Sequence, residues 1–306
     1  MKKFLRWVIL GGTLFFLGKA LKDNWLEVTS IRIDAAGWAI LAIATGITLL
    51  AHTWAGWIWT WVLKELNQTV PTFQFIQVYL KTNIAKYLPG NVWHYYGRIL
   101  AAKDANVSTG VATLSVLLEP LLMLAAALIT IVLFGGQLAI DNVNNMGVKI
   151  IQLLSLAVVL SAVHPRFLNP AIRFLYQLKK NKSESENQSI SNFIIERYPL
   201  KPLLGELVFL GLRGTGFILT MFALSPLHLS QIPLLLGAFS FAWVLGLVVP
   251  GAPGGIGVFE ATALTILQPH FPTALVISAI ALYRLISILA ETAGAALASL
   301  DERLAN

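Results

Sequence analysis

Apolar residues along this chain gather in long stretches instead of alternating with polar ones. The longest stretches are 7–21, 37–63, 107–134, 148–163, 203–224 and 272–300. A helix needs roughly 20 apolar residues to cross a bilayer, a length that most of these reach, although the first and the fourth fall short. The second stretch contains Trp38 and Trp57, and tryptophan is enriched where helices meet the membrane interface. The pattern predicts an all-α integral membrane protein, a polytopic helical bundle of about six spans.

Two further stretches, 73–101 and 233–267, are interrupted by turn-forming residues. The sequence LPGN breaks the first at 88–91, and VPGAPGGIG breaks the second at 249–257. Non-helical backbone at membrane depth persists only where it is buried in protein or lines a wet cavity. We therefore predict two re-entrant helical hairpins, each of which enters and leaves the membrane on one side.

Lysine and arginine predict the orientation, because they favour cytoplasmic loops. Residues 1–6 carry three basic residues, and 165–201 carry seven against three acidic ones. The segments 135–147, 225–232 and 268–272 have no lysine or arginine. We expect both chain termini and the basic loop 165–201 to be cytoplasmic, in the plasma membrane of a prokaryote. The first stretch resembles a signal peptide, but we expect it to remain as an uncleaved helix.

In this orientation, the first hairpin enters the membrane from the cytoplasm and the second enters it from outside. The stretches around each hairpin then run in opposite directions, 37–63 and 107–134 in one half, 203–224 and 272–300 in the other. Such an inverted repeat builds many transporters around a site at the membrane midplane.

Composition agrees with one membrane domain, 1–306. The chain is 57% hydrophobic and 12% charged, with a mean hydropathy of +0.72, whereas soluble domains are about 45–50% apolar. The net charge of +7 comes from residues between apolar stretches, so nucleic acid is not an expected partner. Because the chain has no cysteine, thiolate nucleophiles and cysteine-ligated metals are excluded. No close His and carboxylate cluster predicts another metal site, and we expect no cofactor.

The first break brings together residues that suit a phosphate group. Helix N-termini bind phosphate, and Asn91 is a good N-cap residue for the returning helix. Asn91, Tyr95 and Arg98 share one face of that helix, His94 precedes Arg98 by one turn, and Lys86 lies just before the break. An alternative is that Lys86 and Arg98 extend to the membrane surface and the break only bends a helix.

The second break offers a similar N-terminus at Gly254 and Gly255. Glu260 lies about one turn further on, where a carboxylate interacts favourably with a helix N-terminus. The glycine run is not a dinucleotide loop, because no strand precedes it.

Four charged residues lie inside the long apolar stretches, namely Glu119, Arg213, Arg284 and Glu291. A charge at the centre of a bilayer costs at least about 2.5–3.5 kcal/mol, so each needs a partner or a role. One interpretation is contact with substrate. The other is pairing between helices, for example Arg213 with Glu291 or Arg284 with Glu119.

Residues 86–98 (KYLPGNVWHYYGR) and 252–260 (APGGIGVFE) resemble the transmembrane, or flippase, region of the lysylphosphatidylglycerol synthase family. The resemblance covers nearly the whole chain. It implies movement of a lipid between leaflets, whereas aminoacyl transfer in that family belongs to a separate soluble domain. Since the sequence ends at Asn306, we expect no synthase activity and assign no catalytic residue.

The sequence therefore predicts a translocator for a lipid with an anionic phosphate headgroup. Lys86, Arg98 and the hairpin N–H groups would bind phosphate, and Arg213 and Arg284 would guide it or lock helices. Glu119 and Glu291 would balance charge or relay protons. Two alternatives are a membrane-embedded transferase with His94 or a glutamate as general base, and a scaffold for a lipid-modifying enzyme. Self-association is left open.

Overall fold

The computed structural model describes residues 18–88, 92–135, 146–170, 195, 197–249 and 252–305, and within them the secondary structure is helical, without a strand. The α-helices are α2 (Trp25–Ser30), α3 (Ala35–Glu65), α4 (Thr72–Asn83), α5 (Trp93–Asp104), α6 (Thr109–Phe134), α7 (Met146–Val163), α9 (Leu200–Leu224), α10 (Ile232–Val248), α11 (Val258–Leu267) and α12 (Thr273–Ala305). Short 3-10 helices are η1 (Ile84–Tyr87), η4 (Leu229–Gln231) and η5 (Pro253–Gly255). This confirms the all-α class.

Five helices of the described part are long and apolar enough to cross a membrane. They are Ala35–Glu65, Thr109–Phe134, Leu200–Leu224, Leu229–Val248 and Thr273–Leu304. Four of them coincide with predicted spans, which confirms a multi-pass helical membrane protein.

The other predicted stretches have different outcomes. Leu229–Val248 is the fifth long helix, although the sequence pattern placed it in a hairpin. The stretch 148–163 is helical in α7, but its apolar part, Ile150–Val163, is shorter than a span. The stretch 7–21 lies mostly outside the described residues.

Local signals fix where the long helices begin. Asp34 caps α3, since its Oδ1 accepts the Gly37 N–H at 2.7 Å. Ser108 precedes α6 and accepts the Val111 N–H in the same way. Pro120 lies inside α6 and has no N–H to donate, so it interrupts the helix hydrogen bonds next to Glu119.

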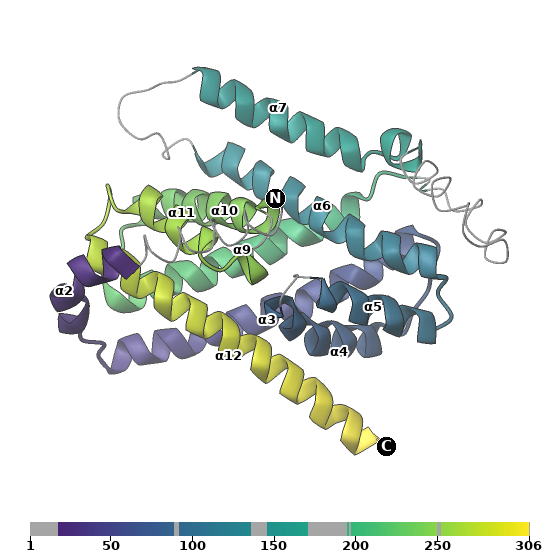
Figure 1. Ribbon diagram of the computed structural model, residues 1–306, viewed down its shortest axis with the longest axis horizontal. Helices are drawn as coiled ribbons and strands as arrows, with labels where there is room; N and C mark the ends of the chain where they lie inside the picture. The colour runs from purple at the N-terminus through teal and green to yellow at the C-terminus, as the bar shows by residue number, and fades with distance from the viewer. Residues whose placement is uncertain are drawn as a thin grey trace.

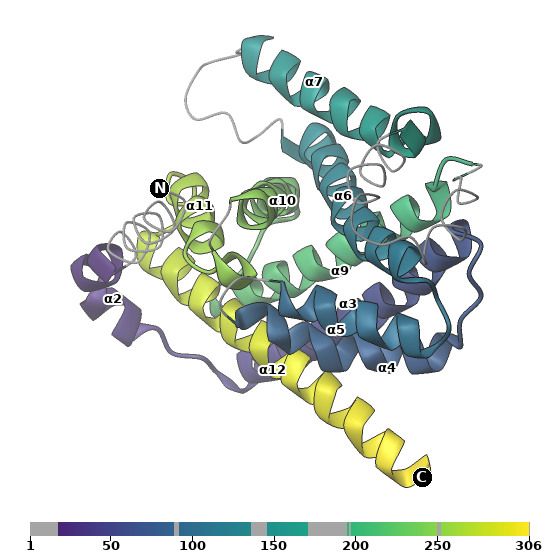
Figure 2. The same ribbon diagram turned by 45° about the vertical axis from the view of Figure 1, so that its right-hand side comes forward.

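The long helices run between two ends of the molecule (Figure 1). The end of α3, the start of α6 and the start of α9 lie at one end, whereas the loops after α9 and α11 lie at the other (Figures 1 and 2). Helix α7 packs on the outside of α6. One core cluster around Trp59 joins α3, α4, α6 and α9, and a second around Phe217, Phe239 and Tyr283 joins α9 to α12.

The two interrupted segments form adjacent helix pairs, and the 3-10 helices η1 and η5 of the two segments are in contact. Helices α4 and α5 lie side by side, as do α10 and α11, and η1 contacts η5 (Figure 2). Gly254 and Gly255 have positive φ values of 59° and 73°, which favour glycine. A Cβ atom at Gly254 would lie 2.8 Å from the Tyr87 ring, so the approach of the two breaks also requires glycine there.

Candidate functional site

A cavity of about 130 Å³ lies where the two breaks meet the long helices. Its lining comes from η1, α4 and α5 on one side and from α10, η5 and α11 on the other, completed by α3, α6, α9 and α12. The volume exceeds the roughly 10–15 Å³ that one water molecule requires. A small polar group therefore fits inside this part of the bundle.

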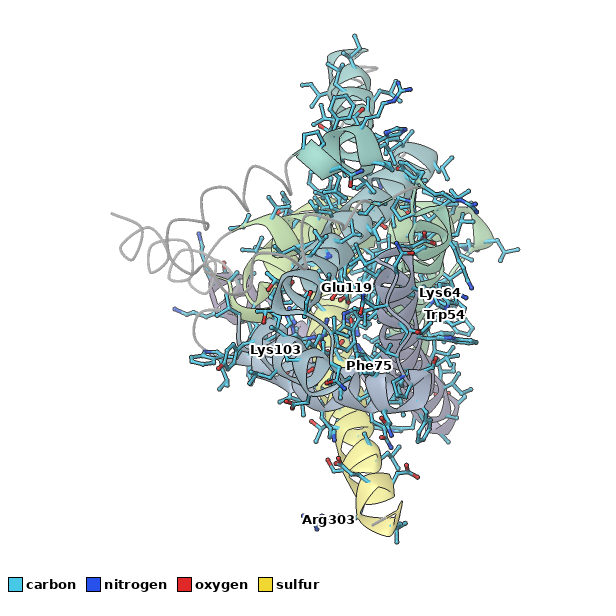
Figure 3. The ribbon with its side chains drawn as sticks, turned by 90° about the vertical axis from the view of Figure 1, so that its right-hand side faces the viewer. Trp54, Lys64, Phe75, Lys103, Glu119 and Arg303 are labelled. Carbon is cyan, nitrogen blue, oxygen red and sulfur yellow. The ribbon has the colours of Figure 1, made fainter. Side chains whose placement is uncertain are left out.

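Arg98 and Glu119 form a buried ion pair in the wall of the cavity. Arg98 Nη1 donates to Glu119 Oε2 at 2.8 Å, and the Tyr79 hydroxyl donates to Glu119 Oε1 at 2.6 Å. The Arg98 guanidinium also lies 3.6 Å from the centre of the Tyr79 ring. Arg98 is only 2% exposed, so it does not extend to the membrane surface. Figure 3 places Glu119 inside the bundle, with Lys64 and Lys103 nearer its edge.

Lys86 of η1 pairs with Glu291 of α12. The ammonium group donates to Glu291 Oε1 at 2.6 Å, and His52 Nε2 lies 3.1 Å from the same oxygen. Asn83 Nδ2 lies 3.3 Å from His52 Nδ1. This network joins α3, α4, η1 and α12, so it fixes the position of η1 relative to two long helices.

Arg284 of α12 contacts both the second break and α11. Its guanidinium pairs with Glu260 and donates to the Gly254 carbonyl at 3.3 Å. Glu260 Oε2 accepts the Gly257 N–H at 2.6 Å, which places its carboxylate at the N-terminus of α11. Glu260 therefore stabilises this turn and also orients Arg284.

Arg213 differs from the other three cations that line the cavity. Lys86, Arg98 and Arg284 each have a carboxylate partner, whereas no ion pair to Arg213 occurs among the described residues. Its guanidinium lies 3.1 Å from His52 Nε2 and donates to the Ser287 hydroxyl at 3.3 Å. Arg213 is 4% exposed, and its guanidinium is buried beside His52, which separates it from the Glu291 carboxylate, and 5.3 Å from the centres of the Trp243 and Tyr283 rings.

Several buried polar atoms of the lining have no hydrogen-bond partner among the described residues. They include Nε of Arg98, Nε of Arg213, Nε1 of Trp243 and Nδ1 of His94. Three of these are N–H donors, and an unpaired buried donor costs about 1–3 kcal/mol. A bound acceptor with several oxygens would satisfy them, and phosphate is such an acceptor.

The cavity collects most of the residues that the sequence singled out. Those in its lining are Lys86, His94, Tyr95, Arg98, Glu119, Arg213, Gly254, Gly255 and Arg284. Glu260 and Glu291 pair with cations of the lining instead. Asn91 lies outside the described residues.

The pairings offered as examples from the sequence are wrong. Glu119 pairs with Arg98 and not with Arg284, because α5 packs against α6. Glu291 pairs directly with Lys86, and Arg213 approaches it only through His52.

Sequence reasoning missed three residues of this region. His52 lies in the middle of the apolar stretch 37–63, the same signal that identified Glu119. Trp243 resembled an ordinary apolar residue of its helix. Glu206 lies near the start of 203–224, where a charged residue usually marks a membrane surface, yet it is completely buried. The described residues contain no group of three or more His, Asp or Glu that could hold a metal ion.

A family model described as the lysylphosphatidylglycerol synthase TM region matches residues 4–294. The chain belongs to this family. The match includes both breaks and every residue of the cavity lining, so the cavity is part of the lysylphosphatidylglycerol synthase transmembrane domain. Membership indicates a membrane function related to lipids. No curated protein matches the chain closely enough to be named as a relative.

Proposed function

We propose that the protein moves a lipid with an anionic phosphate headgroup between membrane leaflets. The phosphate binds in the cavity while the acyl chains remain in the surrounding lipid. The observation that carries the proposal is the charge of the lining, because Arg213 has no carboxylate partner among the described residues. A buried cation without a carboxylate in direct contact is costly unless an anion joins it.

The unpaired donors give the anion its binding geometry. Nε of Arg98, Nε of Arg213 and the indole nitrogen of Trp243 belong to residues of the lining and have no hydrogen-bond partner among the described residues. Charge-assisted hydrogen bonds to phosphate are short and stronger than neutral ones. We assign Lys86 and Arg284 to holding η1 and η5 at the headgroup, because Lys86 ties η1 to Glu291 of α12, and Arg284 of α12 contacts Gly254 of η5 and Glu260 of α11.

In the proposed arrangement, the two breaks are the tips of two re-entrant hairpins. The two hairpins are related to each other as an inverted repeat. The adjacent helix pairs α4 with α5 and α10 with α11 support this arrangement, because η1 and η5 of the two segments meet at the cavity. The basic loop 165–201 and both termini are then cytoplasmic in a prokaryotic plasma membrane. Alternating access at a site between repeats is a common transport mechanism.

Cysteine labelling tests the orientation, because the chain contains no cysteine. Ser230→Cys, in the loop before α10, should react with an impermeant maleimide in intact cells. Asp104→Cys, at the end of α5, should react only after the cells are opened. Both positions are exposed in the structure, so access to the reagent depends on the side of the membrane. The reverse labelling pattern would contradict the orientation.

Purified protein in liposomes tests the function itself. Labelled phosphatidylglycerol and labelled phosphatidylcholine serve as probes, and quenching by external dithionite reports the leaflet that each occupies. We expect faster exchange of the anionic probe than in empty liposomes, and a smaller effect on the zwitterionic probe. Equal exchange with and without protein would refute translocation of this lipid class.

One observation favours a different class of function. His94 Nδ1 is unpartnered at the cavity and is a candidate general base for a lipid phosphate transferase. Mass spectrometry of the recovered lipids distinguishes the two, because a transferase changes the mass of the headgroup and a translocator does not.

A further inference from the structure

Glu206 on α9 is a buried acid that the proposed phosphate site does not use. Its side chain is completely buried, and neither carboxylate oxygen has a hydrogen-bond partner among the described residues. An ionised carboxylate in such surroundings has lost its water and gained no donor, whereas a neutral acid loses much less. The position is therefore suited to a carboxyl group that binds and releases a proton.

The charged and titratable neighbours of Glu206 come from three other helices. Glu119 of α6 and Arg98 of α5 lie within electrostatic range, and so does Tyr79 of α4. Helix α3 presents apolar side chains to the adjoining turn of α9. The Arg98 guanidinium and the Tyr79 hydroxyl both donate to Glu119. One arginine thus faces two acids, and its observed hydrogen bond goes to Glu119.

The protonation of Glu206 decides the charge of the whole region. Four cations line the cavity, and three of them have carboxylate partners, Glu119, Glu260 and Glu291. With Glu206 protonated, one positive charge remains to attract an anion. With Glu206 ionised, the region is already neutral, and a phosphate would bring an unbalanced negative charge into a buried site.

We propose that Glu206 is a proton-binding site coupled to the phosphate site, so that one proton crosses with each anionic headgroup. The inference rests on the proposed function. Coupling between two sites is reciprocal, so a proton on Glu206 strengthens anion binding as much as the anion strengthens proton binding. The proton enters from the acidic side, is carried by the Glu206 carboxyl group, and is released on the other side after the headgroup leaves. A proton and a monoanionic headgroup together carry no net charge.

The test measures the leaflet distribution of labelled phosphatidylglycerol in proteoliposomes under an imposed pH gradient. At one proton per lipid, each pH unit should shift the inner-to-outer ratio about tenfold toward the alkaline side. A potassium diffusion potential without a pH gradient should leave the ratio unchanged. Glu206→Gln should still exchange the probe at equal pH but lose the response to the gradient. Glu27→Gln, a matched change at an exposed glutamate of α2, should behave like wild type.

Each outcome bears on one of the two proposals. No exchange by wild type at equal pH would refute the proposed function itself. Exchange without a gradient response would overturn proton coupling and leave the translocator intact, and a response to a sodium gradient instead would assign the site to a metal cation. A Glu206→Gln variant that still follows the pH gradient would overturn the role of Glu206. If Glu206→Gln fails to fold, Glu206→Asp, which keeps a carboxyl group, should retain the gradient response, and its loss would also overturn the assignment.

Discussion

Replacing Arg98 with alanine should lower the free energy of unfolding by about 3–5 kcal/mol, the cost of breaking a buried ion pair on one side. The change leaves Glu119 buried without its guanidinium and with only the Tyr79 hydroxyl as a donor. Unfolding by sodium dodecyl sulfate in mixed micelles measures this loss. Arg303→Ala, at the exposed end of α12 in Figure 3, should change stability by less than about 0.5 kcal/mol.

A second variant separates the ion pair from other effects of the Arg98 side chain. Arg98→Ala with Glu119→Gln removes both charges, so it should recover at least half of the lost stability. The double variant should exchange labelled phosphatidylglycerol more slowly than wild type, because it lacks a cation of the proposed site. If the double variant is no more stable than Arg98→Ala, the ion pair is not the cause of the loss.

The sequence predicted the membrane spans because their signal is local. A helix that crosses a bilayer must be long and apolar whatever it packs against, and four predicted stretches coincide with long apolar helices. Leu229–Val248 shows the limit of this reasoning. Its length suits a span, but the proline and glycine break that follows favoured a hairpin arm, and helix length does not distinguish the two.

The charged residues that line the cavity were also predictable, since charges in or beside apolar stretches are rare, whereas His52 and Trp243 of the lining were missed. The ion-pair partners of the charged residues were not predictable, because pairing depends on which sides of two helices pack against each other. Arg98 is joined to Glu119 by the packing of α5 against α6, and no sequence pattern specifies that contact. The contact of Glu260 with the start of α11 was anticipated, because both groups lie within one turn of the same helix.

Arg213→Gln should slow the exchange of labelled phosphatidylglycerol about ten- to a hundredfold while the protein remains folded. A charged hydrogen bond to phosphate contributes roughly 1.5–3 kcal/mol, and each 1.4 kcal/mol is a factor of ten. Unlike Arg98, Arg213 has no carboxylate partner among the described residues. Its removal therefore leaves no buried carboxylate without the cation that pairs with it. Glutamine keeps a donor for the Ser287 hydroxyl and for His52, the two groups within hydrogen-bond distance of the guanidinium.

Arg213→Lys provides the matched control, because lysine keeps the charge but loses the planar set of donors. It should recover part of the exchange rate, and neither variant should shift the detergent unfolding midpoint as Arg98→Ala does. Phosphatidylcholine exchange should change less than phosphatidylglycerol exchange in both, since the zwitterionic headgroup carries its own cation. Normal exchange of phosphatidylglycerol by Arg213→Gln would exclude this unpaired charge from headgroup binding, and with it the observation on which the proposed phosphate site depends.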